Sequence, residues 1–141
     1  SFLLEMGNGF CFVERQKRMS VGKDDFYLDL LFYHRHLRRL VAIELKLESF
    51  PPSHKGQMEL YLRWLDKHER TAEEEPPIGL ILCASADAEQ IELLQLDEAS
   101  IRVAEYLVEL PPVAVLRERL HRAIEHARER TALAASDGEQ A

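Results

Sequence analysis

The sequence predicts an α/β fold in which a mixed β-sheet of about five strands is flanked by helices. Residues 78–84 are apolar throughout, which is typical of an interior strand covered on both faces. The amphipathic stretch before them, residues 53–70, would join this strand to the preceding one as a β-α-β crossover. The chain has 141 residues, enough for one hydrophobic core. We therefore expect a single domain over residues 1–135.

The first residues predict the end of a helix and then a strand. Residues 1–6 look like the last turns of a helix that Gly7 terminates, so we expect the sequence to be the C-terminal part of a longer protein. The run Phe-Cys-Phe-Val at 10–13 begins a strand over 9–21, and residues 22–25 read as a turn.

A hairpin is expected next. Residues 26–34 and 40–47 are rich in aromatic and branched side chains, which favour strands. The intervening residues 35–39 are polar and few, as in a hairpin loop.

The rest of the chain predicts two more strands and three helices. Ser53, after two prolines, is the expected N-cap of the first helix, which would end near Arg70. The later elements are a strand at 78–84, a short helix at 87–94, a strand at 100–109, a long helix opened by 111–112, and a frayed, disordered tail at 136–141.

Net charge limits how this chain could bind nucleic acid. The formal charge of −7 argues against a protein that coats nucleic acid by bulk electrostatics. Basic residues nevertheless gather near the carboxylates described below. Either they lie in solvated turns, or they form a rim that faces phosphates, with candidate contacts at Arg15, Lys17, Arg35 and Lys55.

Two acidic residues, Asp29 and Glu44, stand among apolar neighbours in the hairpin strands. An unpaired carboxylate there would cost several kcal/mol. If the loop is centred between His36 and Leu37, Asp29 lies directly opposite Glu44, and like charges in that arrangement destabilise a sheet unless a cation lies between them or one is protonated. The alternative is a structural ion pair with Lys46 or a nearby Arg.

A divalent metal ion is the simplest explanation for this pair. Strand alternation places Glu44 and Lys46 on one face, so the lysine projects beside the carboxylates. Oxygen ligands suit Mg²⁺ or Mn²⁺ rather than zinc. Such an ion activates water and neutralises a phosphoryl oxygen, which suits phosphodiester hydrolysis.

An Asp on one strand followed by Glu-x-Lys on the next resembles the PD-(D/E)XK nuclease superfamily, whose members have a restriction-endonuclease-like fold. Over roughly residues 1–110 the chain is similar to the YhcG-type PDDEXK nuclease domain. Four segments carry this resemblance, namely residues 4–10, 29–35, 41–46 and 56–62.

The resemblance implies a role for each matching residue. Asp29 and Glu44 would bind the metal, the carbonyl of Leu45 would complete its shell, and Lys46 would position the attacking water. Glu5 corresponds to the first acidic position of the superfamily, and Gln57 to its polar assistant. Glu5 could instead be an exposed residue near a helix end, and Gln57 could simply satisfy the first turn of its helix.

These observations predict a Mg²⁺- or Mn²⁺-dependent endonuclease domain that hydrolyses DNA. The alternative is a catalytically silent module of the same fold that binds nucleic acid or a protein partner. The resemblance implies an N-terminal helical domain in the full-length chain, and nucleases of this type often form homodimers. No apolar run could cross a bilayer and no secretory leader opens the sequence, so a cytoplasmic location without membrane attachment is expected.

Overall fold

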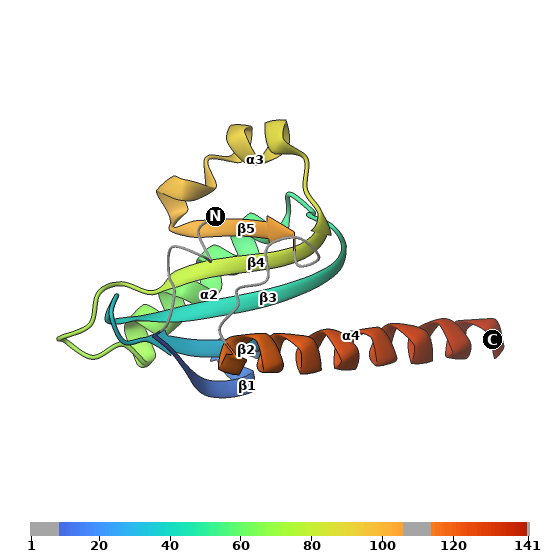
Figure 1. Cartoon of the computed structure of the whole chain (residues 1–141), viewed down its shortest axis with the longest axis horizontal. Coiled ribbons are helices and arrows are strands. Elements are labelled where there is room, and N and C mark those ends of the chain that lie inside the picture. Colours follow the sequence, from blue (N-terminus) through green and yellow to red (C-terminus); the bar gives the residue numbers. More distant parts are fainter. Residues whose placement is uncertain (1–8, 106–113, 141) are drawn as a thin grey trace.

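The computed structural model describes residues 9–105 and 114–140, which form five strands and a set of helices (Figure 1). The predicted helix at 1–6, including Glu5, lies outside the described residues, as do 106–109 of the last predicted strand. The elements in chain order are β1 (Phe10–Val21), β2 (Asp24–His34), β3 (Arg39–Ser49), α2 (His54–His68), β4 (Ile78–Ser85), α3 (Ala88–Leu94), the 3₁₀ helix η1 (Leu96–Ala99), β5 (Ile101–Glu105) and α4 (Ala114–Gln140).

The strands form one mixed sheet in the order β1-β2-β3-β4-β5. The first three strands are antiparallel to one another, whereas β4 is parallel to both β3 and β5. Helix α2 joins the parallel strands β3 and β4, which is the crossover that the apolar run of β4 predicts. The expected α/β fold with five mixed strands is therefore confirmed.

The register of the β2/β3 hairpin agrees with the loop position inferred from the sequence. Leu30 pairs with Ile43, and the pairing continues without a shift to the turn. Extending this register by one residue places Asp29 opposite Glu44.

Two hydrophobic cores lie on opposite faces of the sheet, because successive side chains of a strand alternate between its faces. Helix α2 contributes Met58, Tyr61 and Leu65 to one core, and α4 contributes Leu120 and Ile124 to the other. We call these the α2 core and the α4 core. Strand β3 supplies Ala42 to the α2 core, and Val41, Ile43 and Leu45 to the α4 core.

The helix ends differ in detail from the expected ones. Ser53 precedes α2 as predicted, but its backbone is already helical and its side chain makes no cap hydrogen bond. Asp87, by contrast, caps α3 by accepting a hydrogen bond from the backbone N–H of Gln90. Helix α4 continues to Gln140, through the segment where a frayed tail was expected from residue 136, and extends beyond the sheet (Figure 1). Within the described residues, no helix is both long and apolar enough to cross a membrane.

Candidate active site

Strand β2 changes the direction of its side chains at Asp29. Leu28 and Leu30 are two positions apart and would share a face in a regular strand. Instead, Leu28 lies in the α2 core and Leu30 in the α4 core. The ladder between β2 and β3 also stops at the pair Leu30 and Ile43. Asp29 thus occupies an irregular point of the sheet, where backbone groups are free to bond to side chains.

Asp29 and Glu44 each accept a hydrogen bond from the backbone of the other strand. The N–H of Asp29 donates to Oε1 of Glu44 over 3.0 Å, and the N–H of Leu45 donates to Oδ2 of Asp29 over 2.8 Å. These reciprocal bonds replace the backbone ladder at this position. They hold two carboxyl groups side by side across adjacent strands, and we call these residues the carboxylate pair.

Gln16 of β1 holds Asp29 from its other side. Its Nε2 donates to Oδ1 of Asp29 over 3.0 Å. The backbone of Gln16 has φ of 50°, in the left-handed region that non-glycine residues rarely adopt. Since Arg15 pairs with Leu30 and Lys17 with Leu28, Gln16 lies across from Asp29. Both strands are therefore irregular at the same level of the sheet.

Glu44 is buried, with 6% of its surface exposed. Burial and, to a lesser extent, the neighbouring charge of Asp29 raise the pKa of its carboxyl from 4.5 to about 8, while Lys46 acts in the opposite direction. The carboxyl of Glu44 therefore holds a proton near neutral pH unless a cation takes its place.

Helix α2 presents polar side chains to the same region. Gln57 lies on the same helix face as His54 and Tyr61, and it affects the pKa of both side chains. Burial and the charge of Lys46 lower the pKa of His54. Burial, followed by the charges of Glu44 and Asp29, raises the pKa of Tyr61 to about 12. Gln57 thus lies one helical turn from each of two side chains whose pKa values are shifted by the charges of the carboxylate pair and Lys46.

An open cavity of about 950 Å³ begins at Leu45 and Lys46, the residues that follow Glu44, although neither acid of the pair lines it. It is lined by the end of β3 from Leu45 onward, including Lys46, by His54 of α2, and by Arg130 of α4. A narrow crevice on the α4 side of the sheet reaches Asp29 itself and is lined also by Gln16 and Arg130. The acids therefore lie next to a space that a larger ligand can enter.

A family model described as the YhcG PDDEXK nuclease domain matches residues 1–121. The chain belongs to this nuclease-domain family. It is 40% identical over 123 residues to the protein named "Putative nuclease YhcG" from Escherichia coli (strain K12). The match covers 86% of this chain and 32% of that protein, so the chain spans about a third of the length of its relative.

Solved endonuclease structures resemble this PDDEXK domain in fold. The EndoMS-dsDNA2 complex aligns with a TM-score of 0.51 at 18% identity, over 74% of this chain and 41% of the other. A repair endonuclease from Pyrococcus abyssi aligns with a TM-score of 0.49 at 18% identity, over 75% and 40% of the two chains. Together with the family match, the alignment to the EndoMS complex shows that the sheet has the restriction-endonuclease-like architecture expected from the sequence.

The donor groups of this PDDEXK domain suit a hard divalent cation. Two carboxyl groups that repel each other lie together, which is the arrangement that a bound cation relieves. Within residues 9–105 and 114–140, no cluster of three or more His, Cys, Asp or Glu side chains is found. Mg²⁺ is commonly bound through one or two carboxylates with water completing its shell, so the pair fits this ion.

The four basic residues considered as nucleic-acid contacts occupy different parts of the domain. Arg15 is exposed and lines the crevice that reaches Asp29. The ammonium of Lys17 is bound to Glu69 at 2.8 Å and to Glu14 at 3.4 Å, which raises the pKa of this lysine. Lys17 thus ties β1 to the end of α2.

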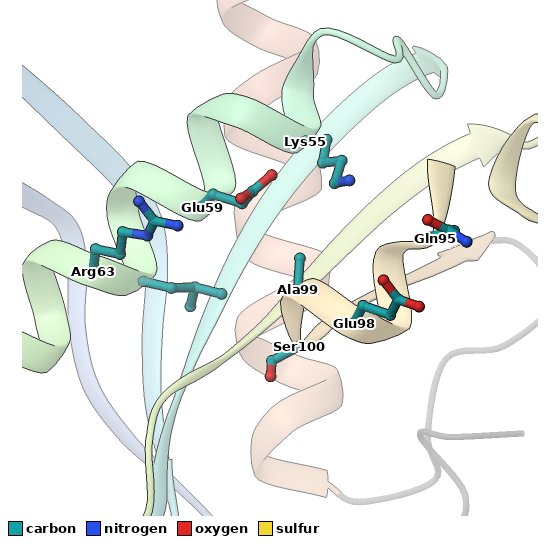
Figure 2. Close-up of a pocket in the computed structure, with 8 residues that line it drawn as sticks. Lys55, Glu59, Arg63, Gln95, Glu98, Ala99 and Ser100 are labelled. Carbon is teal, nitrogen blue, oxygen red and sulfur yellow. The ribbon is translucent and has the colours of Figure 1, made fainter. Parts of the chain in front are cut away.

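Arg35 and Lys55 lie farther from the carboxylate pair. Arg35 is in the β2/β3 turn, six residues along the strand from Asp29, or about 20 Å at the usual rise of a strand. Lys55 donates to the carbonyl of Leu94 over 2.8 Å. It borders a separate cavity of about 370 Å³ between α2 and the segment of α3 and η1 (Figure 2).

Some neighbours of the carboxylate pair were not singled out from the sequence. Gln16 could have been found by centring the first hairpin on residues 22–23, which places it opposite Asp29. His54 precedes Gln57 by three residues and so shares its helix face. Arg130 is far along the chain, and no local pattern brings it to this site.

Proposed function

We propose that this chain is a metal-dependent nuclease domain that hydrolyses DNA phosphodiester bonds with Mg²⁺ or Mn²⁺. The observation that carries this proposal is the carboxylate pair, in which Asp29 and Glu44 are held together by reciprocal bonds to each other's strand. Membership of the PDDEXK nuclease-domain family and the endonuclease fold support the same chemistry.

Asp29, Glu44 and the backbone carbonyl of Leu45 would hold the ion. When bound, it supplies a nucleophilic water at neutral pH and neutralises charge on a phosphoryl oxygen. Glu44 would bind the ion as a carboxylate, so it would give up the proton that its raised pKa retains. The reciprocal backbone bonds keep both carboxyl groups in place before and after this exchange, which lowers the cost of assembling the site.

Lys46 is the basic side chain next to the carboxylate pair. It follows Glu44 on the same face of β3 and lines the open cavity. From there its ammonium would orient the attacking water and stabilise the charge that develops on the phosphate. Gln57 would assist by positioning His54 and Tyr61. Glu5, N-terminal to β1, would serve as the first acidic residue of the superfamily's site.

The substrate assigned here is DNA. One structure of the same fold contains double-stranded DNA, and Arg15 beside the crevice offers a contact to the phosphate backbone. We further propose that an N-terminal helical domain of the full-length protein sets specificity, that the domain pairs as a homodimer to cut both strands, and that it acts in the cytoplasm.

Cleavage of a supercoiled plasmid with Mg²⁺ or Mn²⁺ tests this proposal. Asp29→Ala and Lys46→Ala should abolish cleavage while leaving the circular dichroism spectrum and the melting temperature close to those of the wild type. Asp24→Ala and Lys23→Ala are matched controls, because both residues are exposed near the β1/β2 turn. They should cut at the wild-type rate.

Two results would contradict the proposal in different ways. Undiminished cleavage by Asp29→Ala and Lys46→Ala would move the active site elsewhere. Wild-type protein that binds DNA equally with and without divalent ions, and never cuts it, would identify a catalytically silent module. Calorimetric titration with Mn²⁺ separates these cases, since an enzyme should lose its metal site in Asp29→Asn.

A further inference from the structure

Helix α4 continues its buried face with an arginine. Ala123 and Ala127 are 7% and 9% exposed and lie one turn apart on the side that packs against the sheet. Arg130 follows Ala127 by three residues and Ala123 by seven, so it extends the same face. The small alanines permit close packing of the helix, and Arg130 is exposed just beyond them.

Arg130 lies at the junction of the two spaces beside the carboxylate pair. It lines the open cavity together with Lys46 and His54. It also lines the crevice that reaches Asp29, with Arg15 on the other wall. The same side chain therefore borders the proposed metal ligands on one side and the entry for a large ligand on the other.

The two acidic residues of α4 that precede Arg130 by one and five positions lie near other side chains. Glu125 lies 3.9 Å from Arg128, and Glu129 lies 3.8 Å from His126. Among the side chains that the structure describes, no carboxylate is within ion-pair distance of Arg130. Its guanidinium is thus available to an anion in the cavity.

We propose that Arg130 binds a backbone phosphate of the DNA substrate and makes α4 one wall of the substrate cleft. This inference rests on the proposed nuclease function. A guanidinium suits the role because it donates two parallel hydrogen bonds to phosphate oxygens and stays charged at any physiological pH. Residue 130 lies outside the segment that matches the family model, residues 1–121.

The inference predicts a specific loss in DNA binding. In Arg130→Ala, the dissociation constant for a fluorescein-labelled DNA duplex in Ca²⁺ should rise about tenfold. The plot of log affinity against log salt concentration should become less steep, by the amount that corresponds to about one phosphate contact. With Mg²⁺, KM should rise while kcat changes little, because the residue holds the substrate and not the reacting water. Arg130→Lys should retain part of the affinity.

Arg128→Ala is the matched control. Arg128 precedes Arg130 by two residues, so it points to a different side of α4, and it is paired with Glu125. Its removal should therefore leave DNA affinity unchanged. Calorimetric titration with Mn²⁺ should give the wild-type affinity in both variants, and urea unfolding should show that both are folded. Arg130→Gln provides a second neutral variant if the alanine lowers stability.

The outcomes separate this inference from the proposed function. Equal DNA affinity in the Arg130→Ala and Arg128→Ala variants would overturn the inference, whether or not the wild type cuts DNA. Wild-type protein that binds DNA and never cuts it would overturn the nuclease proposal, while the comparison of the two variants would still decide the role of Arg130. A wild type that neither binds nor cuts would overturn both.

Discussion

Replacement of Glu44 by Gln should change how the stability of the metal-free domain depends on pH. In the folded chain, burial and Asp29 raise the pKa of Glu44 from 4.5 to about 8. Between these values the folded protein holds a proton that the unfolded chain releases. Stability therefore falls as pH rises through this window and changes no further, through this group, above pH 8.

The size of the effect follows from the pKa values. Each pH unit between the two values lowers the free energy of unfolding by about 1.4 kcal/mol. Deprotonation of Glu44 can therefore lower this free energy by on the order of 5 kcal/mol in all. Glutamine keeps the shape and the acceptor oxygen for the N–H of Asp29 but does not titrate. The Glu44→Gln variant should thus lie within about 1 kcal/mol of the wild type at pH 5 and exceed it by several kcal/mol at pH 9.

Urea unfolding in EDTA, at intervals from pH 5 to pH 9, measures this difference. The comparison with Glu44→Gln cancels the contributions of other groups, including His54. Millimolar Mg²⁺ should restore the stability of the wild type at high pH, since a ligand that binds the folded state stabilises it, and should do so much less for the variant. Glu98→Gln is the control, because Glu98 is an exposed residue of η1.

Parallel stability curves for the wild type and Glu44→Gln would refute this reasoning. They would mean that Glu44 titrates in the folded protein as it does in the unfolded chain, and that the two acids do not share a confined site. A Mg²⁺ effect of equal size in both proteins would refute the assignment of Glu44 as a metal ligand.

Substitutions at three further positions test the contacts that hold Asp29 in place and the packing of the two cores. Gln16→Ala should lower the free energy of unfolding by about 1–2 kcal/mol, because it removes the hydrogen bond to Asp29, and it should bind Mn²⁺ more weakly by calorimetry. Gln16→Gly loses the same bond, but glycine adopts the positive φ without strain, so this variant should be about 1 kcal/mol more stable than Gln16→Ala. Gly79→Ala should destabilise by about 1–3 kcal/mol in urea, because the added Cβ would lie 2.8 Å from Met58 Cγ and Sδ, and the loss should be smaller when Met58→Ala is already present. Leu120→Ala should cost about 2–5 kcal/mol by removing a fully buried side chain of the α4 core, while Leu133→Ala, on a residue that is 65% exposed, should leave the unfolding midpoint unchanged.

The hairpin shows why the centre of the site could be predicted. Strand alternation and a short loop are local properties, and together they place Asp29 across from Glu44. The aliphatic run of β4 similarly predicts the parallel crossover, because a strand covered on both faces needs apolar residues on both. These features depend on few residues close in sequence.

The remaining features depend on contacts between distant segments. The sequence by itself determined the strand order around the hairpin, the pairing of the two acids and the presence of Lys46 beside them. Only the tertiary structure decided that β2 reverses its faces at Asp29, that Gln16 bonds to this residue from β1, and that α4 brings Arg130 to the cavity. The physical reason is that irregular backbone and helix docking are set by packing across the whole sheet, which no local periodicity encodes.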